Sequence, residues 1–270
     1  MSLIDRLRNE QRPLLVWGHG LGDFCNFLPI YHEIIKRTGK RVSLGVQSKR
    51  QFHLIYPNVI LTDKLNSIAG FSYIYNVKYK EDNNDLTKAE NCAINEFGME
   101  NFVWEPHQFK NDVDNNNKRV GVNFFGITGS NKESKFCSLK TAYRIWYEIK
   151  AAGYIPFELY QRVGFINDYY RDGNVPDDFP LADKTNSLRF KEPNLKLLHE
   201  EIKKCCRVIS TDSGILYLAL STIGKDNVIG LENQKKISRY LPIEIEKVDV
   251  ADYKKKSVFN LLTKGGSDET

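Results

Sequence analysis

The sequence lacks the marks of a secreted, membrane-spanning or zinc-binding protein. Its five cysteines are scattered except for the adjacent pair Cys205 and Cys206, and neither a CxxC nor an HExxH motif occurs. An odd number of scattered cysteines is typical of reduced thiols, so we expect a cytoplasmic protein with no disulfide and no bound metal. We also expect no signal peptide and no membrane span, because no apolar run approaches ~20 residues. Peripheral contact with a membrane surface stays open.

The sequence also has little excess of charge of one sign. Its 39 Lys and Arg residues against 34 Asp and Glu residues give a formal net charge of +5. A nucleic-acid-binding domain often shows a sharper concentration of basic residues on one element. A modest positive charge suits a phosphate-rich ligand or an anionic surface equally well. The length of 270 residues, with 41% apolar residues, is enough for two domains of ordinary size.

The first half of the chain alternates between strand-like and helix-like patterns. An apolar run at 14–17 predicts a buried strand, and a glycine-rich turn follows it. Apolar residues then recur at helical spacing over 24–38, and a second strand is predicted over 41–46. This order favours a right-handed crossover between parallel strands. Short strands near 59–61 and 73–77 would extend the sheet.

A second series of the same kind follows the polar stretch 110–118, which is the best linker candidate. Strands are predicted over 119–124, 154–160, 207–210 and 227–231, and helices over 138–152, 194–206, 215–223 and near 253–262. We therefore predict an α/β protein with parallel sheets in two Rossmann-like domains that face a cleft. The predicted domains are residues 1–113 and 118–250, and residues 251–270 form a helix and a frayed tail.

The first candidate site is the glycine turn after the first strand. It contains His19, Gly20, Gly22 and Asp23. Ligands of parallel sheets bind beyond the carboxyl ends of the strands, and a helix N-terminus there offers free N–H groups. Asp23 is either a helix cap or a general base aimed into the cleft, and both roles could coexist. His19 could contact a phosphate or an acceptor, although a lone histidine in a turn is more often incidental.

Two further candidates lie in the second half. Asp212, Ser213 and Gly214 form a turn between a strand and a helix, which suits a diphosphate or a ribose but is also an ordinary capped connection. The loop 125–135 is long for a strand-to-helix link and could hold a pyrophosphate, or it could be a solvated polar loop. The loop contains the polar residues Thr128, Ser130, Lys132 and Lys135, and also Gly129.

These three regions, in this order, resemble the heptosyltransferase-like glycosyltransferases of family 9, which use ADP-heptose and have the two-domain GT-B fold. Members open with a strand, a Gly-Asp pair and a helix that carries Leu-Pro, as Gly22-Asp23 and Leu28-Pro29 do here. Their second half begins with a Gly/Ser/Thr loop and a lysine before a helix, as Gly126 to Ser130 and Lys135 do. The resemblance covers most of the chain.

The last hallmark of the family is an Asp-Thr/Ser-Gly turn with a histidine three residues after the glycine. Here the turn is Asp212-Ser213-Gly214, and Tyr217 occupies the histidine position. Residues 136–138 read Phe-Cys-Ser where the family usually has a Lys-x-Trp-Pro pattern. These departures bear on the identity of the donor rather than on the fold.

The resemblance implies a metal-independent, inverting transfer from a nucleotide-diphosphate sugar, with no further cofactor. Asp23 would be the general base, with His19, Gly20 and Gly22 lining the acceptor side. The implied donor-binding residues are Thr128, Gly129, Ser130, Lys135, Asp212, Ser213, Gly214 and Tyr217. Lys135 and the helix N-termini would stabilise the departing nucleoside diphosphate, and the C-terminal helix would return to the first domain.

Three alternatives stay open. The acceptor could be a modified base in DNA, as in phage-type enzymes, although we expect a glycan or lipopolysaccharide-type acceptor. DNA binding would show a steep dependence on salt. The chain could also be a nucleotide-sugar-binding module without catalysis, which the Tyr217 position permits. A sugar-nucleotide epimerase would need further acid and base groups that the sequence does not reveal.

Overall fold

The computed structural model describes residues 2–63, 68–79, 86–109, 117–124, 137–159, 194–233, 241, 243–253 and 257–263. The chain divides into two compact units. The first comprises Met1–His107 with Ser238–Glu244, and the second comprises Gln108–Ile237 with Ile245–Thr270. Each unit contains its own parallel sheet, as the α/β prediction requires. Of the predicted linker, residues 110–116 lie outside the described residues.

The sheet of the first unit has the strand order β3-β2-β1-β4, with every pair parallel. Its strands are β1 (Pro13–Trp17), β2 (Ser43–Val46), β3 (Ile60–Leu61) and β4 (Tyr73–Asn76). The central strand β1 is apolar along nearly its whole length, as expected for a parallel strand that is covered on both faces.

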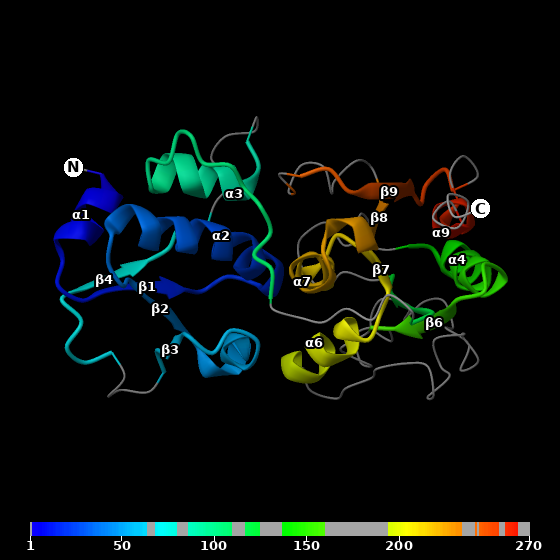
Figure 1. Ribbon diagram of the computed structural model, residues 1–270, viewed down its shortest axis with the longest axis horizontal. Coiled ribbons are helices and arrows are strands. Elements are labelled where there is room, and N and C mark those ends of the chain that lie inside the picture. Colours follow the sequence, from blue (N-terminus) through cyan, green and yellow to red (C-terminus); the bar gives the residue numbers. More distant parts are fainter. Residues whose placement is uncertain are drawn as a thin grey trace. The chain divides into compact units, whose positions relative to one another are not determined.

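Helix α2 (Leu21–Thr38) connects β1 to β2 and is the main helix of the first unit (Figure 1). It ends at Gly39, whose left-handed backbone (φ 67°) lets its N–H reach the carbonyls of the last turn. The other helical segments are α1 (Leu3–Asn9), two short 3-10 turns (Ser48–Arg50 and Phe52–Leu54), α3 (Lys88–Asn91) and a π-helical turn (Cys92–Glu96). Both α1 and α3 pack against α2.

The sheet of the second unit has the order β6-β5-β7-β8-β9, again with every pair parallel. Its strands are β5 (Arg119–Asn123), β6 (Ile155–Glu158), β7 (Arg207–Thr211), β8 (Val228–Glu232) and β9 (Glu246–Asp249). The chain runs from β5 to β6 on one side and then returns past β5 to β7 on the other. This reversal is the pattern of a doubly wound sheet.

The helices of the second unit form two pairs (Figure 1). They are α4 (Leu139–Ala151), α6 (Leu195–Lys203), α7 (Gly214–Ile223) and α9 (Val258–Thr263), with a 3-10 turn at Lys225–Asn227. Helix α4 packs against α9, and α6 packs against α7. Right-handed crossovers in opposite directions place α4 and α7 on opposite faces of the sheet. In helix α7, every residue after Gly214 is buried.

Helix α9 packs against α4 of the second unit, and the return of this helix to the first domain stays a prediction. Val258, Leu261 and Leu262 are buried in one apolar cluster with Trp146 and Ile149 of α4. These three side chains of the helix are therefore covered within the second unit, whereas Phe259 on the same helix is exposed.

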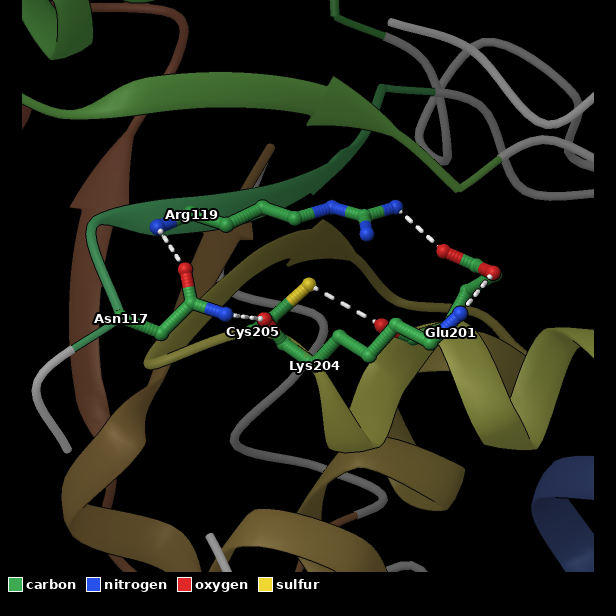
Figure 2. Close-up of polar contacts among 5 residues, drawn as sticks. All are labelled: Asn117, Arg119, Glu201, Lys204 and Cys205. Carbon is green, nitrogen blue, oxygen red and sulfur yellow. Dashed lines mark hydrogen bonds and ion pairs between the residues drawn. The ribbon is translucent and has the colours of Figure 1, made fainter. Parts of the chain in front are cut away.

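A polar network fastens the amino end of β5 to the end of α6, at the edge opposite the predicted sites (Figure 2). The Arg119 guanidinium donates to Glu201, whose other carboxylate oxygen accepts from Lys204 at 2.7 Å. The Asn117 amide donates to the Lys204 carbonyl, and its oxygen accepts from the Arg119 backbone N–H at 2.9 Å. The Cys205 thiol completes the network by donating to the Glu201 carbonyl.

Candidate active site

Each sheet has one point where the chain reverses its direction of winding, and these points are where parallel α/β sheets usually bind ligands. In the first unit the point lies between β1 and β4, and in the second unit it lies between β5 and β7. The glycine turn at 18–23 follows β1, and the turn at Asp212 and Ser213 follows β7. Both predicted turns therefore lie at the edge where a ligand is expected.

Asp23 lies in the first turn of α2, and the N-cap of this helix is Gly20. The capping interpretation of Asp23 is therefore wrong in its strict form, although a carboxylate in the first turn still interacts favourably with the helix dipole. One third of the Asp23 side chain is exposed, and the Lys88 ammonium lies 4.0 Å from Oδ1. Gly22 belongs to the same turn of helix. The structure thus presents a solvent-accessible carboxylate at the reversal point.

His19 bridges the reversal point of the first sheet. Its Nε2 lies 3.1 Å from the carbonyl oxygen of Val77, the residue after β4. A carbonyl only accepts hydrogen bonds, so Nε2 carries a proton and donates it to this oxygen. The ring also packs edge-on against Trp17, with centroids 4.9 Å apart. His19 is therefore a fixed part of this edge.

Three further groups at this edge were not predicted from the sequence. The Arg50 guanidinium donates to the Gly18 carbonyl at 3.0 Å and adds a cation to the turn. Glu96 accepts from the Lys78 N–H at 2.8 Å, and burial raises the pKa of its carboxyl group. Tyr79 is buried, and its pKa is raised well above the usual value by burial and by the negative charge of Asp23. Arg50 and Tyr79 had a sequence signal, since each closely follows a predicted strand.

In the second unit, the buried side-chain amide of Asn123 holds the turn that follows β7. The Asn123 Nδ2 at the end of β5 donates to the hydroxyls of Ser210 at 3.0 Å and of Ser213 at 2.9 Å. Ser213 is the N-cap residue of α7, yet its side chain makes no capping hydrogen bond within the described chain. Its hydroxyl contacts Asn123 instead, so Ser213 does not cap the start of α7, where the Leu216 N–H donates to the Ser213 carbonyl at 3.0 Å. Gly214 begins the helix.

The side chain of Asp212, which lies just before α7, is held by a residue of that helix. The hydroxyl of Tyr217 donates to Asp212 Oδ1 at 2.9 Å, and both side chains are buried. Asp212, Ser213, Gly214 and Tyr217 thus lie together at the start of α7, and the Tyr217 hydroxyl is directed at Asp212.

Two buried polar atoms at the same edge stand out. Asn123 Oδ1 and Thr211 Oγ1 have no hydrogen-bond partner among the residues that the structure describes. They lie at the carboxyl ends of β5 and β7, on either side of the reversal point. Buried polar groups are nearly always hydrogen-bonded, so these atoms point to a ligand or a loop at this position.

The third predicted region cannot be placed, because 125–136 lies outside the described residues. This concerns Thr128, Gly129, Ser130 and Lys135. In the described part of the chain, no group of three or more His, Cys, Asp or Glu residues is arranged to hold a metal ion. The same residues contain no helix that is both long and apolar enough to span a membrane.

The fold is similar to that of a glycosyl transferase of family 9 from Veillonella parvula, with a TM-score of 0.62. The match covers 91% of this chain and 88% of that one at 10% sequence identity. The fold is that of the family 9 glycosyltransferases. At such low identity the likeness establishes the fold alone, and at that level it confirms the resemblance seen in the sequence. No protein-family model and no curated protein sequence matches this chain.

Two proteins of Escherichia coli give similar results. TibC from the enterotoxigenic strain H10407, an iron-containing dodecameric glycosyltransferase, matches with a TM-score of 0.62 and 15% identity, over 88% of this chain and 64% of TibC. The heptosyltransferase WaaC with ADP matches with a TM-score of 0.58 and 9% identity, over 94% of this chain and 98% of WaaC. TibC has also been seen in complex with ADP-D-β-D-heptose.

Proposed function

We propose that the protein is a metal-independent, inverting glycosyltransferase. In this proposal it moves a sugar from a nucleotide-diphosphate sugar to a hydroxyl group of a glycan or lipopolysaccharide-type acceptor in the cytoplasm. The observation that carries the proposal is the position of Asp23, a partly exposed carboxylate in the first turn of α2 at the reversal point of a sheet. A structural likeness to enzymes that bind ADP and ADP-heptose supports it.

Asp23 is the general base of the proposed reaction. Its carboxylate accepts the proton of the acceptor hydroxyl while the hydroxyl oxygen attacks the anomeric carbon of the donor sugar. The bond from that carbon to the diphosphate breaks as the new bond forms, so the configuration inverts and the nucleoside diphosphate leaves. The nearby Lys88 ammonium compensates the charge of Asp23.

The second unit binds the donor in this proposal. The first N–H groups of α7 are suited to a phosphate, since Ser213 does not cap them in the described structure. Asp212, Ser213 and Gly214 contact the ribose or the phosphate. Thr128, Gly129, Ser130 and Lys135 are proposed to hold the diphosphate and to stabilise it as it departs.

A thermal-shift screen with ADP-, UDP-, GDP- and CMP-sugars, with and without EDTA, tests donor binding. A ligand at 100 times its dissociation constant stabilises a protein by ~2.7 kcal/mol, which raises the melting temperature by several degrees. We expect one nucleotide to give a shift that EDTA does not change. A shift that EDTA removes would contradict metal independence. Duplex DNA is added to the same screen as a further ligand, and a shift with DNA alone would support the DNA-modifying alternative.

The substitution Asp23→Asn tests the base. We expect the variant to bind the nucleotide sugar as the wild type does but to lose transfer to the acceptor by a factor of at least ~100, because the amide cannot take the proton. Glu33→Gln is the matched control, since it makes the same change on the surface of the same helix. Full transfer by Asp23→Asn would exclude Asp23 as the base.

A further inference from the structure

The pair formed by Tyr217 and Asp212 is buried at the start of α7. Tyr217 is 6% exposed and Asp212 is 5% exposed. Side chains of a helix lean toward its N-terminus, so a tyrosine in the first turns of α7 can reach back to the residue that precedes the N-cap. The hydroxyl does so, and it lies 2.9 Å from Asp212 Oδ1.

The direction of this hydrogen bond follows from the chemistry of the two groups. An ionised carboxylate only accepts, so the tyrosine hydroxyl donates its single proton to Oδ1. Hydrogen bonds to a charged group are among the stronger ones in proteins. The bond therefore fixes the rotation of the Asp212 side chain while the neighbouring Ser213 is held separately by Asn123.

The charge of Asp212 also restricts what it can bind. A carboxylate accepts hydrogen bonds from hydroxyl groups, whereas it repels a phosphate at short range. The phosphate-binding groups at this edge are the N–H groups of α7, which Ser213 leaves uncapped in the described chain. The two parts of the turn are thus suited to different parts of a nucleotide sugar.

We propose that Tyr217 is a positioning residue that holds the Asp212 carboxylate in the orientation in which it accepts a hydrogen bond from a hydroxyl group of the donor. Tyr217 acts through Asp212 and not by touching the donor, and the diphosphate is bound by the first turn of α7. This inference rests on the proposed function, because it assumes that the second unit binds a nucleotide sugar.

Calorimetric titration of the full-length protein with ADP-glucose, UDP-glucose and inorganic pyrophosphate tests the inference. We expect Tyr217→Phe to weaken binding of the preferred nucleotide sugar about tenfold, as expected for the loss of one hydrogen bond to a charged group. Pyrophosphate binding should not change, because pyrophosphate has no sugar hydroxyl to donate a hydrogen bond to the carboxylate. Tyr154→Phe removes another hydroxyl from the same unit and serves as the control.

A double-mutant cycle with Asp212→Asn separates positioning from a general structural role. If Tyr217 acts through Asp212, then Tyr217→Phe should cause no further loss of affinity once Asp212 is replaced. Additive losses, an equal loss of pyrophosphate binding, or unchanged nucleotide-sugar binding in Tyr217→Phe would each overturn the inference. If Tyr217→Phe does not fold, Asp212→Asn must still weaken binding of the nucleotide sugar and leave binding of pyrophosphate unchanged.

Failure of the proposed function gives a different result from failure of this inference. If the wild-type protein binds none of the nucleotides, the proposed function fails and the inference fails with it. If the wild type binds a nucleotide sugar and Tyr217→Phe binds it equally well, only the role of Tyr217 is overturned.

Discussion

At the residue scale, Gly121 shows how closely the second sheet is packed. A Cβ atom at this position of β5 would lie 2.5 Å from Leu159 Cδ1 and 3.1 Å from Cys205 Sγ. Both neighbours are buried. The absence of a side chain here is therefore a packing requirement, because it lets Leu159 and Cys205 lie close to the backbone of β5.

We expect Gly121→Ala to destabilise the protein by about 1–3 kcal/mol, since the added methyl group forces Leu159 to move in a filled core. Urea unfolding followed by circular dichroism measures the effect. Gly18→Ala is the control, because a Cβ at Gly18 would meet nothing within 4 Å. Equal stability of the two variants would show that the core around Leu159 adapts without cost.

The sequence predicted the positions of two turns at helix starts, because a local rule applied there. A glycine turn after a buried strand placed Asp23 near a helix start, and the turn at Asp212 followed from the same pattern. The contribution of Arg50 could not be predicted, because its contact with Gly18 depends on the pairing of β1 with β2. The hydrogen bond from Tyr217 to Asp212 likewise could not be predicted, because it depends on the geometry of α7.

At the scale of elements, the network around Glu201 joins β5 to α6 (Figure 2). We expect Glu201→Ala to destabilise the protein by about 2 kcal/mol, because the largely buried Arg119 loses its charged partner. Lys204→Ala should cost less than ~0.5 kcal/mol, since that side chain is mostly solvated. Chemical denaturation compares the two, and a larger loss in the lysine variant would contradict this ranking.

Most elements were predicted from apolar patterns, with ends that shifted by a few residues. The strands β1, β5, β7 and β8 are largely buried and each contains Val, Ile or Leu, as a parallel sheet covered on both faces requires. Strand β9 was missed because only Val248 of its four residues is buried, which leaves no run to detect. Helix α1 was also missed, although Ser2 and Asp5 form a capping box that could have revealed it.

At the scale of the whole molecule, local sequence patterns could not predict which surface α9 packs against. The sequence predicted a helix near its position, but only the assembled core decides which surface an apolar face meets. The fold itself was predictable because the order of turns and strands is repeated in both halves, and this order determines where each sheet reverses.

The stability of the molecule should fall in mild acid. Burial lowers the pKa of His199 from 6.5 to about 4, and the nearby Lys203 adds to this effect. Below pH 6.5 the unfolded chain therefore binds a proton that the folded chain resists, so stability is lost as the pH falls from 6.5 to about 4.

We expect the loss from His199 at pH 5 to be about 2 kcal/mol relative to pH 7. His199→Leu should remove that part of the loss, as measured by urea unfolding at both pH values. His32 and His107 also have lowered pKa values, so only the difference between the two proteins reports on His199. An identical pH dependence in both proteins would contradict the assignment.

All five cysteines of the chain are buried thiols. Surface cysteines introduced by mutation would therefore be the accessible targets for maleimide dyes in the native protein. Lys36 on α2 and Tyr147 on α4 are largely exposed and belong to different units. A Lys36→Cys, Tyr147→Cys double variant would carry a fluorophore pair without removal of any native thiol, and energy transfer would report the separation of the units as nucleotides are added.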